Sequence, residues 1–298
     1  MEDVDASPQT DVEIESPHAP ALSRMPDKPV VLNEAVDSRA SLSLRDLWAY
    51  RELLQFLVWR DIKVRYKQTA MGAAWAIIQP VTLVLTFAVF FGIFVGVPTE
   101  GMPFLIFYYC GLLPWTFFAN SISTASMSLV GNSNLITKVY FPRIIIPAAA
   151  VGAGLIDLFI ALLILVGMVL CYGIPITLNI LMLPILILLT VLLAFGLGAW
   201  LAALTVKYRD IRHALPFILQ LWMFLTPIIY PLNVVPEKWR WVMYINPLTG
   251  IVEGVRASLA GQQFNRPSLL LSAAVVIIIL MCSAYSFRRT EKSFADLI

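Results

Sequence analysis

The sequence predicts an all-α polytopic membrane protein with six transmembrane helices, an N-terminal amphipathic interface helix, and a re-entrant or interfacial outer hairpin between helices 5 and 6. Apolar residues make up 59% of the 298 residues and charged residues only 13%, whereas soluble domains hold roughly 45–50% and about 25%. Six apolar segments have the length of a membrane span, and Lys and Arg gather in alternate loops. This composition excludes an ordinary soluble enzyme and a disordered chain.

Residues 1–43 form a separate acidic block. They hold nine acids, three Lys or Arg, five prolines and no aromatic residue. Such a stretch buries too little apolar surface to offset its ordering entropy, so we expect a disordered cytoplasmic tail. Its first 15 residues contain no Lys or Arg, unlike a secretory signal. The first spanning helix is therefore expected to direct its own insertion.

Residues 44–67, LRDLWAYRELLQFLVWRDIKVRYK, predict the interface helix. At 3.6 residues per turn, one stripe collects basic side chains and the opposite stripe collects Val58, Ile62 and Tyr66. A basic amphipathic helix with Trp near each end suits the surface of an anionic cytoplasmic leaflet. A soluble helix packed on a neighbour is the alternative. The candidate membrane-contacting residues are Arg45, Trp48, Arg60, Lys63 and Lys67.

The transmembrane domain is expected over residues 68–290, followed by a cytoplasmic C-terminus at 291–298. Each predicted span is near the roughly 20 residues that cross ~30 Å of hydrocarbon. The loops of one side carry 17 Lys and Arg and those of the other side carry four, which predicts that both termini lie in the cytoplasm. The spans are expected at about 73–97, 105–129, 148–172, 178–204, 214–230 and 268–287.

The outer connection 231–267 is long and contains three prolines. Asn246 and Pro247 predict a helix start, with Asn as the N-cap and Pro as the first helical residue. The run 248–260 has a helical pattern but is too short to span. A re-entrant or interfacial hairpin fits these features, because irregular backbone at membrane depth needs protein or water beside it. A solvated outer loop is the alternative.

The sequence contains no catalytic constellation that we can identify. Asp157 is the one acid inside a predicted span; it either bonds a neighbouring helix or serves in a relay. Gly131–Lys138 fails the phosphate-loop pattern, because Ile136 replaces the second Gly. We therefore expect no enzyme activity, no metal and no cofactor bound by this chain. The isolated cysteines and the net charge of +2 predict neither a disulfide framework nor nucleic-acid binding.

Two inner loops are candidate docking surfaces for a partner protein. In GNSNLITKVYFPRIIIP at 131–147, aromatic residues precede a cation, and exposed aromatics and Arg are enriched at protein interfaces. The second loop, KYRDIRH at 207–213, is short and charged. Simple positive-inside anchoring is the alternative. The candidate docking residues are Lys138, Tyr140, Phe141, Arg143, Lys207, Arg209 and Arg212.

At these stretches the chain resembles the ABC-2-type permease subunit of bacterial polysaccharide exporters, which move O-antigen, capsule and teichoic-acid chains across the inner membrane. The resemblance covers about residues 44–290. It is carried by WRDIKVRYKQTAMGAAWAIIQP at 59–80, NLITKVYFPRIIIP at 134–147, KYRDIRH at 207–213, and TPIIYPLNVVPEKWRWVMYINPLTGIVEGVR at 226–256. It implies a homodimer with two cytoplasmic ATPase subunits that hold ATP-Mg, a docking loop near 131–147, and two short outer helices that line the exit.

The resemblance implies a lipid-linked glycan as the cargo. Aromatic faces suit sugar rings, and the candidate pathway or gate residues are Trp115, Phe117, Phe118, Trp200, Trp222, Trp239, Trp241 and Tyr244. Two other functions stay open: an ABC-2 exporter of a small hydrophobic compound, and a membrane glycosyl- or prenyl-transferase. The transferase would need metal-binding acids such as D-x-x-x-D, and the loop acids lack that spacing.

Overall fold

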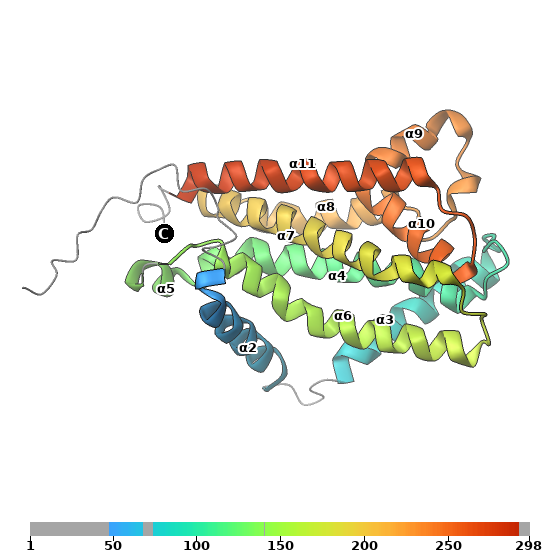
Figure 1. The fold of residues 1–298 in the computed structure, drawn as a ribbon, viewed down its shortest axis with the longest axis horizontal. Coiled ribbons are helices and arrows are strands. Elements are labelled where there is room, and N and C mark those ends of the chain that lie inside the picture. The colour runs from blue at the N-terminus through green and yellow to red at the C-terminus, as the bar shows by residue number, and fades with distance from the viewer. Residues whose placement is uncertain (1–47, 68–73, 140, 292–298) are drawn as a thin grey trace, which may run out of the picture. The chain divides into compact units, whose positions relative to one another are not determined.

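The computed structural model describes residues 48–67, 74–139 and 141–291, and all regular structure in these ranges is helical (Figure 1). Five helical stretches are long and apolar enough to cross a membrane. They match five of the six predicted spans, with ends displaced by less than one helical turn. These stretches are Trp75–Phe94, Phe104–Gly131, Ile145–Cys171, Leu178–Lys207 and Arg266–Thr290.

The first stretch consists of the α-helix α3 (Trp75–Phe87) and the π-helical segment η2 (Ala88–Phe94). The second and third are α4 (Phe104–Gly131) and α6 (Ile145–Cys171), with the short α5 (Ser133–Lys138) between them. The fourth joins the 3₁₀ turn η3 (Leu178–Met182) to α7 (Leu183–Lys207). The last lies in α11 (Arg266–Glu291).

The fifth predicted span, 214–230, differs from the structure. The helix there, α8, covers Ile211–Leu225 and is only 15 residues long. It ends before Thr226-Pro227, because a residue preceding Pro disfavours the α conformation and Pro lacks an N–H donor. The chain then makes the 3₁₀ turn η4 (Leu232–Val234) and two short helices, α9 (Glu237–Ile245) and α10 (Pro247–Ala260).

Helix α4 lies at the centre of the packing. In the most apolar 18-residue stretch of α4, 78% of the residues are buried, whereas in the corresponding stretches of the other four candidate spans 22–33% are buried. It packs against α6 and α7 along its length and against α3, α8 and α10. Small residues allow the closest approach: a Cβ added at Gly198 of α7 would lie 2.8 Å from the Cβ of Ala125. Helices in lipid associate through such contacts, because lipid tails are as apolar as their side chains.

Helix α2 (Arg51–Lys67) packs against α6. Leu57 is buried in a second apolar cluster, which it shares with Phe141, Phe287 and residues of α4, α6 and α7. Leu53, Leu54 and Val58 pack against this cluster, whereas Phe56 and Trp59 are exposed. One face of α2 is therefore held by the protein, and the other presents aromatic side chains outward.

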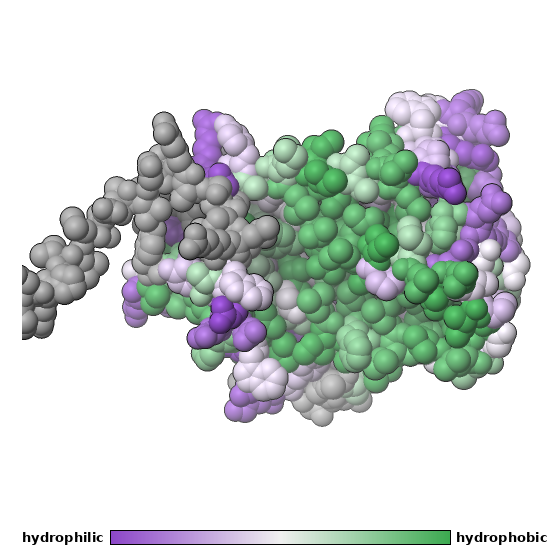
Figure 2. All heavy atoms as spheres, in the orientation of Figure 1, coloured by the Kyte–Doolittle hydropathy of each residue, from purple (hydrophilic) through white to green (hydrophobic). Residues whose placement is uncertain are grey.

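The long helices run between two polar ends. Helices α2 and α5 lie at one end, and α9 and α10 lie at the other (Figure 1). Basic residues close α7 and α11 in their last turns, Lys207 in one helix and Arg288 with Arg289 in the other. Figure 2 shows an apolar band between hydrophilic ends. Within the described residues, the segments that sequence analysis assigns to the cytoplasm thus gather at the α5 end, and those assigned outside gather at the α9–α10 end.

Candidate functional site

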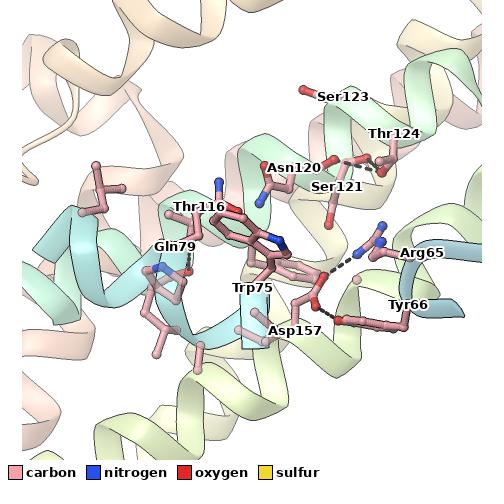
Figure 3. Close-up of a pocket in the computed structure, with 18 residues that line it drawn as sticks. Arg65, Tyr66, Trp75, Gln79, Thr116, Asn120, Ser121, Ser123, Thr124 and Asp157 are labelled. Atoms are coloured by element: carbon pink, nitrogen blue, oxygen red, sulfur yellow. Dashed lines mark hydrogen bonds and ion pairs between the residues drawn. The ribbon is translucent and has the colours of Figure 1, made fainter. Parts of the chain in front are cut away.

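The carboxylate of Asp157 connects α6 to α2. Asp157 lies near the middle of the 27-residue helix α6. One carboxylate oxygen accepts a hydrogen bond from the Arg65 guanidinium and the other accepts one from the Tyr66 hydroxyl. Both donors come from the last turn of α2, so a single acid ties the end of that helix to the centre of a predicted span (Figure 3).

This pairing accounts for the charges at the site. An isolated carboxylate inside a span is costly, and the guanidinium supplies the opposite charge with a strong charge-assisted hydrogen bond. The side chains of Arg65 and Asp157 remain 33% and 34% exposed. Burial, together with the adjacent Asp157 carboxylate, raises the pKa of Tyr66 to about 12. The Tyr66 hydroxyl therefore stays protonated and donates at physiological pH.

A cavity of about 450 Å³ adjoins this pair. It lies between the end of α2, the first turns of α3, the middle of α4 and the middle of α6. Its wall combines apolar side chains with polar ones, and α4 contributes a run of hydroxyl and amide groups (Figure 3). The polar lining residues are Arg65, Tyr66, Gln79, Thr116, Asn120, Ser121, Ser123, Thr124 and Asp157, and Trp75 lies beside them.

A second polar cluster surrounds Arg256 of α10, whose side chain is only 3% exposed. Its Nη1 donates to the carbonyl oxygen of Pro227 at 2.7 Å, and its Nη2 donates to that of Ile228 at 2.6 Å. These carbonyls belong to the non-helical segment after α8. Backbone groups freed by a helix break need new partners where water is scarce, and the guanidinium provides them.

The charge of Arg256 is balanced within α10. Glu253, one turn earlier, accepts from Nη1 at 3.2 Å, and burial raises the pKa of the Glu253 carboxyl. The guanidinium lies 3.7 Å from the centre of the Phe107 ring, a cation–π contact. Helix α4 comes this close because residue 111 is Gly: an added Cβ would lie 3.0 Å from Nη2 of Arg256 and 3.2 Å from the Cα of Ile228.

Asn246 fastens the start of α10 to the end of α8. Its Oδ1 accepts from the backbone N–H of Leu248 at 3.1 Å, which confirms the predicted N-cap. The same oxygen accepts from Nε1 of Trp222 at 3.1 Å, and its Nδ2 donates to Oγ1 of Thr226 at 2.9 Å. One short side chain thus fixes the angle at which the hairpin leaves α8.

The family model for the ABC-2 type transporter matches residues 52–260. The chain belongs to the ABC-2 type transporter family. It is 29% identical over 258 residues to an O-antigen export system permease protein, RfbA, of Myxococcus xanthus, covering 86% of this chain and 98% of that protein. It is 25% identical to RfbA of Klebsiella pneumoniae (83% and 95% covered) and 27% identical to the polysialic acid transport protein KpsM of Escherichia coli (80% and 94%).

The predicted docking residues of this ABC-2 chain differ in exposure. Lys138, Lys207, Arg209 and Arg212 are exposed and Arg143 is half-buried. Phe141 is buried, contrary to the expectation of an exposed ring, because it packs in the apolar cluster with Leu57 and Phe287. The Phe141 ring therefore holds the loop against the helices and is not itself exposed for contact with a partner protein. Tyr140 lies outside the described residues.

The predicted interface residues follow the outward face of α2 only in part. Trp48, Lys63 and Lys67 are exposed, and Nζ of Lys63 lies 5.1 Å from the centre of the Trp59 ring. Arg60 is half-buried and pairs with Asp61 at 2.7 Å. Arg45 lies outside the described residues. Phe56 and Trp59, which the stripe analysis omitted, complete the exposed aromatic and basic face.

The predicted pathway aromatics fall into two groups. Trp115, Phe117 and Phe118 are buried in the core around α4, and Phe118 packs edge-on against Trp222 at 5.2 Å between ring centres. The Phe117 ring lines the cavity beside Asp157. Trp200, Trp239 and Trp241 are exposed, and the half-buried Tyr244 accepts a hydrogen bond from Asn265 at 3.1 Å.

Sequence analysis missed Arg65, Tyr66 and Arg256. The sequence nevertheless contained a signal for Arg65 and one for Arg256. Arg65 falls on the apolar stripe of its helix, where a cation requires an acid partner, and Asp157 is the one acid in a predicted span. Arg256 stands in an apolar 14-residue helix with Glu253 one turn away. Among the described residues, no group of three or more His, Cys, Asp or Glu side chains is placed to hold a metal ion.

Replacing Asp157 with Asn should destabilise the chain, because it leaves the Arg65 guanidinium without its counter-charge. Both partners are about one-third exposed, so we expect a loss of about 1–2 kcal/mol, between the values for exposed and buried pairs. The apparent Tm of the purified protein in detergent measures it. Asp61→Asn is the matched control: its pair with Arg60 has similar exposure but joins adjacent residues of one helix, so its loss should change the Tm little. Equal shifts in the two variants would contradict the assignment.

Replacing Arg256 with Met should have a larger effect, because two backbone carbonyls and Glu253 lose their donor. Breaking a buried pair costs about 3–5 kcal/mol, which corresponds to a fall in Tm of roughly 6–20 °C at about 2–4 °C per kcal/mol. Arg256→Lys should rescue only part of it, since an ammonium lacks the planar fork. Arg240→Met is the control, because Arg240 of α9 also donates to backbone carbonyls but is 32% exposed. A smaller loss in Arg256→Met than in this control would refute the anchoring role.

Proposed function

We propose that this chain is the transmembrane permease subunit of an ATP-driven exporter that moves a polysaccharide across the bacterial inner membrane. The observation that carries the proposal is the family membership together with relatives of matching length. The chain covers 94–98% of three permease or transport proteins whose names specify O-antigen or polysialic acid. The cargo is a lipid-linked glycan of the O-antigen, capsule or teichoic-acid type.

The working unit of this proposal is a homodimer. The interior of one protomer is filled: the buried side chains of α4, α6, α7 and α10 form one continuous core. A sugar chain therefore needs a path outside that core, and two copies related by a two-fold axis would enclose it. Two-fold dimers are the commonest symmetric assembly. The exposed Trp239 and Trp241 of α9 would then lie near the outer mouth of the path.

Two cytoplasmic ATPase subunits complete the exporter, and these partners bind ATP-Mg. Their docking surface on the permease consists of α5 with Arg143 and the segment 207–213, where the exposed cations lie. A push on α5 reaches α2, α4 and α6 through the apolar cluster that contains Phe141. The pair of Arg65 and Asp157 moves α2 together with α6.

Both termini face the cytoplasm in this proposal, and α2 lies at the inner surface of the membrane. Support comes from the 17-to-4 bias of basic residues and from the exposed Phe56, Trp59 and Lys63 on α2. Helix α8 acts as the sixth spanning element with the segment that follows it. Helices α9 and α10 form the outer hairpin, braced by Arg256 against α4.

Deleting the gene should remove a surface glycan while its lipid-linked precursor accumulates inside the cell. Surface glycan is measured on intact cells by antibody or lectin, and precursor in membrane extracts. The wild-type gene should restore export. A variant of the partner ATPase that lacks its phosphate-loop lysine should show the same loss of surface glycan and the same accumulation of precursor. A normal surface glycan together with new sensitivity to a small hydrophobic compound would instead support the competing export function.

Arg143→Glu should weaken ATPase docking, because it reverses the charge of a loop cation beside the buried Phe141. A desolvated anchor is worth about 2 kcal/mol, or roughly 30-fold in Kd. Copurification of the ATPase with the permease measures it, with insertion checked by detergent-extracted yield. Arg266→Glu is the matched control, because Arg266 begins α11 at the α9–α10 end of the long helices, away from α5. If both variants retain the ATPase and export glycan normally, this loop has no docking role.

Single cysteines should report the orientation of the chain in intact cells. In a background without the native cysteines, Ser133→Cys and Arg209→Cys should be protected from an impermeant thiol reagent, whereas Lys238→Cys should react. The charge bias and the separation of the two ends motivate this pattern. Permeabilised cells provide the control, since all three sites should then react. Labelling of Ser133→Cys from outside would reverse the proposed orientation.

A further inference from the structure

We propose that the cavity beside Asp157 is a binding site for one neutral sugar ring of the exported chain. This inference rests on the proposed function for the origin of the sugar. It assigns a role to residues outside the aromatic set predicted to line the pathway, Phe117 excepted. The site lies between α2, α3, α4 and α6 (Figure 3).

The size and lining of the cavity fit such a ligand. About 450 Å³ falls within the roughly 300–1,000 Å³ of small-molecule sites. Thr116, Asn120, Ser123 and Thr124 of α4 lie three or four residues apart, so they share one face of that helix. A face that met only lipid would be apolar, because hydroxyl and amide groups are costly in hydrocarbon. This face is therefore built for a polar ligand.

Ser121 provides an independent observation. Its side chain is only 2% exposed, it lines the cavity, and its Oγ has no hydrogen-bond partner among the described residues. An unpaired buried hydroxyl costs free energy. Other hydroxyls of α4 satisfy themselves on the preceding turn: Thr124 donates to the carbonyl of Asn120 at 2.9 Å and Ser123 to that of Ala119 at 2.8 Å. Ser121 is thus a buried hydroxyl of the cavity wall that lacks a partner among the described residues.

Trp75 supplies the apolar part of the site. Its side chain is 52% exposed although it begins a predicted span, and it lies beside Thr116 and Asn120 across the cavity (Figure 3). A sugar ring presents C–H groups on its faces and hydroxyls around its edge. An indole face beside hydroxyl and amide groups complements both features. The Phe117 ring and Leu113 close the same wall.

The charge of the lining selects a neutral ring over a phosphate. Arg65 is the one cation in the lining and Asp157 the one anion, and they pair with each other. A phosphate would have to share the guanidinium with the carboxylate and would be repelled by it. A hydroxyl, by contrast, can donate to Asp157 and accept from Arg65 without breaking the pair.

The site is tested by measuring whether a ligand protects an engineered cysteine from a thiol reagent. The full chain is used in lipid nanodiscs, so the test requires neither the ATPase nor export. Thr124→Cys is made in a Cys171→Ser/Cys282→Ser background, since those two cysteines are exposed and Cys110 is buried. The rate at which a small methanethiosulfonate modifies the cysteine is measured in the presence of dodecyl maltoside, whose headgroup is a neutral disaccharide. It is measured again in the presence of dodecylphosphocholine. Both probes are kept below their micelle-forming concentrations. Thr137→Cys, exposed in α5, is the control site.

Dodecyl maltoside should slow modification of Thr124→Cys about tenfold and leave Thr137→Cys unchanged, while dodecylphosphocholine should protect neither. Trp75→Ala and Ser121→Ala should each raise the half-protecting concentration by about tenfold, the change that ~1.4 kcal/mol of binding produces. Trp200→Ala, an exposed Trp outside the cavity, should not. Equal protection by both probes, protection by dodecylphosphocholine alone, or no protection would overturn the proposal. Failure here with normal glycan export would leave the proposed function standing.

Discussion

The guanidinium of Arg256 is the contact on which the α9–α10 half of the structure depends. It donates to the carbonyls of Pro227 and Ile228, pairs with Glu253 and lies on the Phe107 ring. The constraint behind it is general: backbone released from a helix at membrane depth must find partners in the protein. Because Pro227 ends α8 early, the break, the short helix α10 and the central helix α4 are joined at one side chain.

The half that carries α2 and α5 is held by a second charged contact of different character. The pair of Arg65 and Asp157 is partly exposed and links two helices that otherwise meet through apolar contacts. A fully buried cluster at the α9–α10 end favours a rigid brace, whereas a half-exposed pair beside a cavity is easier to rearrange. Motion driven by the proposed ATPase docking would therefore begin near α2 and α5, with α10 moving as a unit with α4.

These two contacts bear on how an ABC-2 chain would move a glycan. The core around α4 is continuous, so in the proposed dimer each protomer would form one wall of the path. The cavity beside Asp157 lies off that core, on the side of α2 and α3. A sugar held there would contact the end of α2, the helix that the proposed ATPase docking would displace. Helix α2 would therefore link sugar binding to the movement of the ATPase subunits.

The sequence by itself determined the membrane class, five of the spans and the cap at Asn246, because these follow from local composition, length and turn chemistry. Its family resemblance also indicated the ABC-2 type transporter. Only the tertiary structure decided that Phe141 is buried and that Arg65 meets Asp157. Those partners are separated by 92 residues, and helix periodicity fixes which face a residue occupies but not which distant helix will cover it.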